Sequence, residues 1–131
     1  MKTKILGFFL AASLITAASC SDDDSSDDNG NNSREVRYEV TGTFTGTLDL
    51  AYTTANGSPF LEEISTLPWT EEFTALPATQ GVTITATGAG EPGETITLKI
   101  FVGGEEVASA NGVANGSGIV SAATLPYVFP N

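Results

Sequence analysis

The stretch VRYEVTGTFTGTLDLAY, residues 36–52, decides the fold. Its apolar side chains recur at even positions, and this period of two predicts strands with one buried face. The parity continues past Gly42 and Gly46, which excludes a simple two-residue turn and leaves a three-residue loop, a bulge or one long bent strand. The predicted inward-facing residues are Val36, Tyr38, Val40, Phe44, Leu48, Leu50 and Tyr52.

Further along the chain, a glycine pair at 103–104 lies between two apolar runs. Such a pair predicts a two-residue hairpin turn. Counting outward from this turn, Val102 is expected opposite Glu105, and Ile100 opposite Val107. The hairpin is therefore predicted to keep an apolar pair in register.

The remaining segments have the same β character. NGSP at 56–59 and NGSG at 115–118 predict turns, and residues 60–76 read as two short strands broken at Pro68, which cannot donate in a central strand. A last strand is expected over 119–130. Further inward-facing residues are Val82, Ile84, Ala86, Ile96, Leu98, Ile100 and Val102. Residues 35–131 are thus predicted to form one all-β domain, an immunoglobulin-like two-sheet antiparallel β-sandwich of about seven strands.

Residues 1–19 are predicted to be a signal peptide. Lys2 and Lys4 precede an apolar run of 14 residues, 5–18, which is shorter than the roughly 20 residues needed to cross a bilayer. The run ends in AASC, which resembles the lipobox of bacterial lipoproteins. That resemblance implies cleavage before Cys20 and attachment of lipid to its sulfur; the alternative is an incidental thiol beside an ordinary cleavage site.

Residues 20–34 are predicted to be a disordered tether rich in Asp, Ser and Asn. The segment holds five aspartates and no aromatic or aliphatic residue, so burial cannot offset its chain entropy. It does not fit an EF-hand, because Gly30 at the sixth position puts Val36 where a carboxylate is required. CSDDD resembles the export signal of Bacteroidetes-type lipoproteins, which implies an outer-membrane, cell-surface location.

The charge balance disfavours two classes of partner. Loss of Lys2 and Lys4 with the signal peptide leaves 3 basic residues against 16 acidic ones, a net charge of −13. Such a surface repels nucleic-acid phosphates and anionic headgroups. Nucleic-acid binding is therefore not expected, and contact with the membrane is expected to come from the lipid.

The residues for catalysis and for metal binding are largely missing. The chain has no histidine, and its one cysteine is assigned to lipid, so histidine triads, thiol enzymes and zinc sites lack their parts. The carboxylate pairs 62–63, 71–72 and 105–106 alternate across strands and read as solvated edge charges. GAGEPG, residues 88–93, matches GxGxxG but leads into a β-run instead of a helix. We therefore predict a non-enzyme with no metal and no cofactor.

Three aromatic residues are candidates for ligand binding. Trp69, the only tryptophan, is interpreted first as a core plug between the sheets. The alternative is an exposed platform on which a sugar stacks, with Tyr52 or Tyr127 beside it. An exposed Trp69 would favour glycan binding.

Three segments lie between residues 36 and 110: VRYEVTGTFTGTLDLAYTT, LPWTEEF and ITLKIFVGGEEVASA. Taken together and in this order, they resemble the soluble domain of MmpS-type proteins. The resemblance implies a membrane-tethered β-sandwich that is an accessory to large lipid and siderophore exporters of the resistance-nodulation-division class. Family members usually have an N-terminal transmembrane helix where this chain has a lipobox, and often a cysteine pair that this chain lacks. The matching positions are Tyr38, Val40, Gly42, Leu67, Pro68, Trp69, Ile100, Val102, Gly104 and Val107.

These observations predict a lipid-anchored, non-catalytic lipoprotein of the cell envelope. Its sandwich is expected to act as an accessory or binding module, with an envelope transporter as the implied partner. The alternative is a surface glycan-binding or adhesin-like module.

Overall fold

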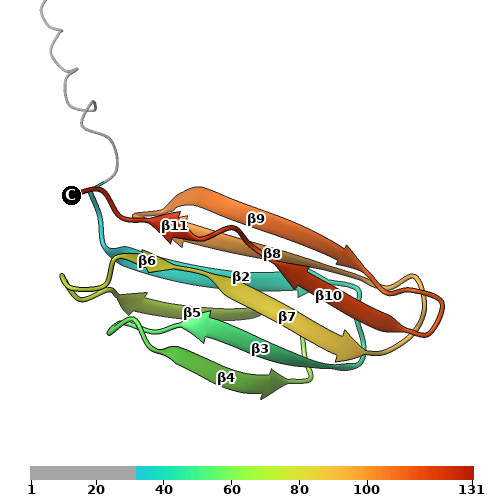
Figure 1. The fold of residues 1–131 in the computed structure, drawn as a ribbon. Helices are drawn as coiled ribbons and strands as arrows, with labels where there is room; N and C mark the ends of the chain where they lie inside the picture. The colour runs from blue at the N-terminus through green and yellow to red at the C-terminus, as the bar shows by residue number, and fades with distance from the viewer. Residues whose placement is uncertain (1–31) are drawn as a thin grey trace, which may run out of the picture. The chain divides into compact units, whose positions relative to one another are not determined.

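The computed structural model describes residues 32–131, which form antiparallel sheets and contain no helix. The predicted signal peptide, Cys20 and the tether up to residue 31 lie outside the described residues. Two four-stranded sheets lie one over the other, and a two-stranded sheet adjoins them (Figure 1). The predicted all-β sandwich is therefore confirmed.

The first sheet has the order β5-β2-β8-β9, and the second has the order β10-β7-β3-β4. The first comprises β2 (Glu35–Gly42), β5 (Trp69–Thr74), β8 (Thr95–Val102) and β9 (Glu105–Val113). The second comprises β3 (Thr47–Thr53), β4 (Pro59–Ile64), β7 (Ile84–Ala89) and β10 (Ile119–Ala123). The small sheet pairs β6 (Gly81–Val82) with β11 (Tyr127–Val128).

The alternation seen in the sequence defines the core. All the residues predicted to face inward are buried, and they line the space between the two large sheets. β2 and β3 belong to opposite sheets, and the chain crosses between them over residues 43–46. Both strands therefore turn their even-numbered side chains toward the same core, which is why the parity continues past Gly42 and Gly46.

Tyr38 joins the two sheets at the centre of this core. Its side chain is 0 % exposed, and its hydroxyl donates a hydrogen bond of 2.6 Å to the carbonyl of Thr53 on the opposite sheet. The amide of Thr83, which lies between β6 and β7, donates a 3.2 Å hydrogen bond to the Thr53 hydroxyl. Burial raises the pKa of Tyr38, so it remains a neutral donor.

The hairpin between β8 and β9 differs from the prediction by one residue. Val102 does pair with Glu105, as expected, but Ile100 pairs with Ala108 instead of Val107. A β-bulge between Ile100 and Phe101 accounts for the shift, because the extra residue is left unpaired in β9. The predicted register beyond the turn was therefore wrong.

The number of strands also exceeds the expected seven. Residues 60–76 do form two strands, β4 and β5, with Pro68 between them. The expected last strand is divided, however: Pro126 lies in the gap between β10 and β11, and β11 pairs with β6. A proline has no amide proton to continue the ladder, which explains the break.

The separation between the two large sheets differs at the two long edges of the sandwich. Strands β9 and β10 approach closely, since a Cβ added to Gly112 would lie 2.9 Å from the carbonyl oxygen of Ser121. At the opposite edge, β4 and β5 turn large side chains inward, among them Phe60, Trp69 and Phe73. These large rings keep β4 and β5 apart, so a cleft forms at this edge.

Candidate functional site

A cluster of aromatic rings fills the edge between β4 and β5. The ring of Tyr52 lies at its centre, with centroid distances of 5.3 Å to Tyr38, 5.4 Å to Trp69 and 5.7 Å to Phe60. Phe73 extends the cluster from β5, at 5.5 Å from Tyr38. All these pairs are tilted, the geometry in which the positive edge of one ring meets the negative face of another.

The cluster borders a cleft of about 320 Å³, which we call the aromatic cleft. This volume lies at the lower end of the range for small-molecule sites. The side chain of Phe60 is 50% exposed, whereas that of Tyr52 is only 5% exposed. The aromatic cleft is lined by Tyr52, Thr54, Ala55, Phe60, Glu71 and Phe73.

Carboxylates give the aromatic cleft a negative charge. The hydroxyl of Tyr52 donates a 2.7 Å hydrogen bond to Glu62 on β4, and Glu71 approaches from β5. Burial raises the pKa of Tyr52, and the hydrogen bond to Glu62 and the charges of Glu62 and Glu71 raise it further. Tyr52 therefore remains a neutral donor at physiological pH.

The loop that borders the aromatic cleft is held by hydrogen bonds. The carbonyl of Ala55 accepts from the amide of Leu76 at 2.8 Å and from the hydroxyl of Thr79 at 2.7 Å. Arg34 in turn donates to the carbonyls of Leu76 and Thr79, and its guanidinium lies 4.2 Å from the centroid of the Phe129 ring. Arg34, the last residue of the predicted tether, thus bonds to the domain and supports the wall of the cleft.

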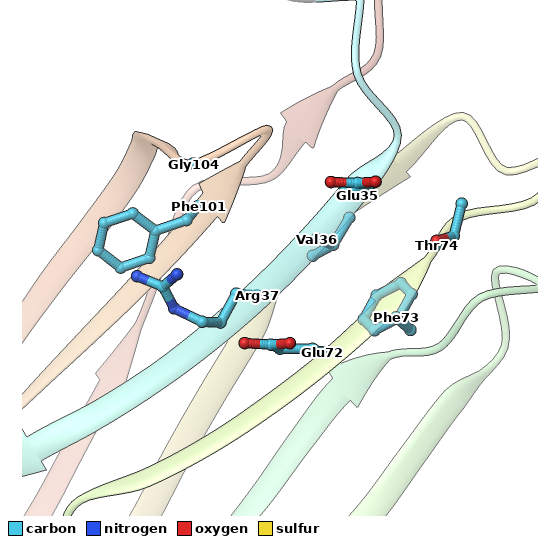
Figure 2. A pocket seen from close by; sticks show the side chains of 8 residues that line it. All are labelled: Glu35, Val36, Arg37, Glu72, Phe73, Thr74, Phe101 and Gly104. Atoms are coloured by element: carbon cyan, nitrogen blue, oxygen red, sulfur yellow. The ribbon is translucent and has the colours of Figure 1, made fainter.

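A second, larger hollow of about 520 Å³ lies on the outer face of the first sheet (Figure 2). Figure 2 shows Arg37 extended toward the ring of Phe101, and its guanidinium lies 4.1 Å from the ring centroid. Glu35 and Glu72 also line this hollow. Arg37, the one cationic side chain of its lining, is therefore already stacked on Phe101 and flanked by carboxylates. The aromatic cleft is therefore a better candidate for binding than this hollow.

The structure brings together two of the three predicted aromatic candidates. Tyr52 and Trp69 are in contact, but Tyr127 lies on β11, where its ring packs edge-on against Phe129 at 5.4 Å. Trp69 is partly buried and packs against the core, between the two roles considered for it. The three residues therefore do not form one platform.

Phe60, Phe73 and the inward orientation of Glu62 and Glu71 were not predicted from the sequence. Tyr52 pairs with Phe60 across a five-residue loop, 54–58, whereas counting outward from a two-residue turn at 56–57 would have placed Tyr52 opposite Leu61. Glu62 and Glu71 come from different carboxylate pairs, and both act on Tyr52. Alternation along a strand predicts only that the two carboxylates of one pair point to opposite faces. It does not predict that β4 and β5, which belong to opposite sheets, meet at one edge.

No metal-binding group was found in the described part of the chain. Within residues 32–131, no three acidic, histidine or cysteine side chains lie close enough together to hold an ion. The GAGEPG motif begins in β7 and ends in the loop that leads to β8, so the described residues place no helix N-terminus after it. Residues 32–131 contain no helix, and so none that is long and apolar enough to cross a bilayer.

The fold and the edge between β4 and β5 define a β-sandwich module with one small aromatic cleft. The model of the family described as "Mycobacterium membrane protein" matches residues 3–123, and the chain belongs to this family. The match supports the MmpS-type resemblance and a membrane-associated accessory role, whereas the Bacteroidetes lipoprotein context remains a prediction. No match was found among curated proteins.

Proposed function

We propose that this chain is a lipid-anchored, non-catalytic protein of the cell envelope whose sandwich is an accessory module of an exporter complex. The family match over residues 3–123 supports a membrane-associated accessory role, and the lipobox resemblance at Cys20 supports the lipid anchor. The described residues also contain no histidine or cysteine, so they offer no thiol or imidazole for catalysis. The exporter is the partner implied by the MmpS-type resemblance.

The test of the accessory role is cross-linking in native membranes followed by purification of the tagged full chain. We expect a large polytopic transporter to be recovered in stoichiometric amount. A sample from cells lacking the transporter gene serves as the control. Recovery of the chain alone after efficient cross-linking would contradict the exporter role.

Replacement of Cys20 by alanine is expected to abolish incorporation of labelled fatty acid. The reason is that Cys20 is the only thiol in the chain and is the residue that the lipobox resemblance assigns to lipid. Metabolic labelling and gel migration of the precursor measure the effect. Labelling that persists in Cys20→Ala would refute the lipid anchor.

We further propose that the anchored protein lies in the outer membrane and faces the cell exterior. The support for this is the resemblance of CSDDD, residues 20–24, to a surface-export signal. Protease treatment of intact cells tests it, with alanine replacements of Asp22, Asp23 and Asp24 as the comparison. Protection of the unmodified chain from protease would rule out surface exposure.

A glycan-binding module is the second candidate function. The observation that favours it is the half-exposed Phe60 near the partly buried Trp69, since aromatic rings at such an edge can stack on sugars. A polysaccharide array probed with the full chain tests this candidate. Binding that is lost in Phe60→Ala would support it, and the absence of any array signal would remove it.

A further inference from the structure

We propose that the aromatic cleft binds a small organic cation, an ammonium group carried on an apolar body. The cleft combines three aromatic rings with a carboxylate and contains no lysine or arginine. Aromatic faces attract cations through their quadrupole, and a carboxylate adds a direct charge interaction. This inference concerns the ligand of the cleft and does not depend on the exporter role.

The rings supply the apolar part of the site. Phe60 is half exposed on the edge strand β4 and can be reached by a ligand, while Tyr52 and Phe73 line the cleft beside it. Tyr52 donates its hydroxyl hydrogen to Glu62, so the polar end of this ring is already satisfied. The ligand is thus offered ring carbons and not a free hydroxyl donor.

Glu71 supplies the charge. It extends from β5 into the cleft, and no cation of the described residues lies in the lining to neutralise it. The three basic side chains of residues 32–131 are engaged elsewhere: Arg34 with backbone carbonyls, Arg37 with Phe101, and Lys99 with Glu106 at 3.3 Å. Against 11 acidic side chains in the same region, an anionic ligand would be repelled.

The site is held in shape before any ligand arrives. Thr54, which lines the cleft, shares its hydroxyl hydrogen between the carbonyl oxygen of Ser58, at 2.8 Å, and Oδ1 of Asn56, at 2.9 Å. Ala55 is fixed by its bonds to Leu76 and Thr79. A preformed wall lowers the entropy lost when a small ligand binds.

The test titrates benzyltrimethylammonium into the purified full chain in a non-ionic detergent. Trp69, the only tryptophan, lies 5.4 Å from the ring of Tyr52 and reports binding through its fluorescence. We expect a saturable change with this cation and none with benzyl alcohol or benzoate at equal concentrations. Equal binding of benzyl alcohol, or no response to the cation, would overturn the proposal.

Two variants and a matched control localise the site. Glu71→Gln is expected to weaken binding about tenfold, and Phe60→Ala about threefold, since one removes the charge and the other a ring face. Glu72→Gln removes the same charge from the same strand, but this residue is exposed on the opposite face, so affinity should not change. Circular dichroism confirms that each variant is folded.

The control also separates the cleft from a general charge effect. An equal loss of affinity in Glu71→Gln and Glu72→Gln would overturn the assignment to the aromatic cleft. Displacement of the cation by a neutral oligosaccharide would overturn it as well and would favour the glycan-binding candidate. Binding with the expected variant pattern would stand even if no exporter is recovered by cross-linking.

Discussion

Replacement of Tyr38 by alanine is expected to lower the free energy of unfolding by about 3–5 kcal/mol, the usual cost of removing a large buried ring. The side chain is 0 % exposed and lies among Tyr52, Phe73 and the inner faces of both sheets. The remaining cavity would lie at the centre of the core, where neighbouring strands cannot collapse into it. Urea unfolding of the full chain followed by circular dichroism measures the change.

Replacement of Tyr38 by phenylalanine separates the hydrogen bond from the packing. This variant keeps the ring but leaves the carbonyl of Thr53 without the 2.6 Å hydrogen bond, and we expect a loss of about 1–3 kcal/mol. The amide of Thr83 is bonded to the Thr53 hydroxyl and does not replace the lost donor. A Tyr38→Phe variant as stable as the unmodified protein would show that the bond between the sheets contributes nothing.

Replacement of Gly118 by alanine is expected to cost more than about 2 kcal/mol. Gly118 has a φ of +81°, and a Cβ there would lie 2.1 Å from the carbonyl oxygen of Gly90. The same residue accepts a 2.8 Å hydrogen bond from the amide of Gly90. The added methyl group would therefore separate two loops at the end of the sandwich.

Two other glycines provide matched controls for this experiment. Gly93 has a φ of +86° but open space around it, so Gly93→Ala should cost only the conformational penalty of about 1–2 kcal/mol. Gly116 has no atom within 4 Å of an added Cβ, and Gly116→Ala should change stability by less than about 0.5 kcal/mol. Equal losses for Gly118→Ala and Gly93→Ala would contradict the close approach of the loops.

The aromatic cleft shows where prediction from the sequence stops. The pairing of Tyr52 with Phe60 depends on a five-residue loop at 54–58, and the turn predicted at 56–59 does not give this register. Glu71 and Phe73 come from β5, which belongs to the other sheet, so no local pattern relates them to Tyr52. The half-burial of Trp69 likewise depends on β5 being an edge strand, which is a property of the sheet order.

The sequence by itself determined which side chains face the core, because side chains alternate along a strand whatever its partners are. It also determined the break between β4 and β5, since Pro68 has no amide proton to donate. Only the tertiary structure decided the bulge opposite Ile100, the order of strands in each sheet and the meeting of β4 with β5 at one edge. These features arise from pairing between distant segments, whose energies depend on how the two sheets pack together and not on the local sequence of either strand.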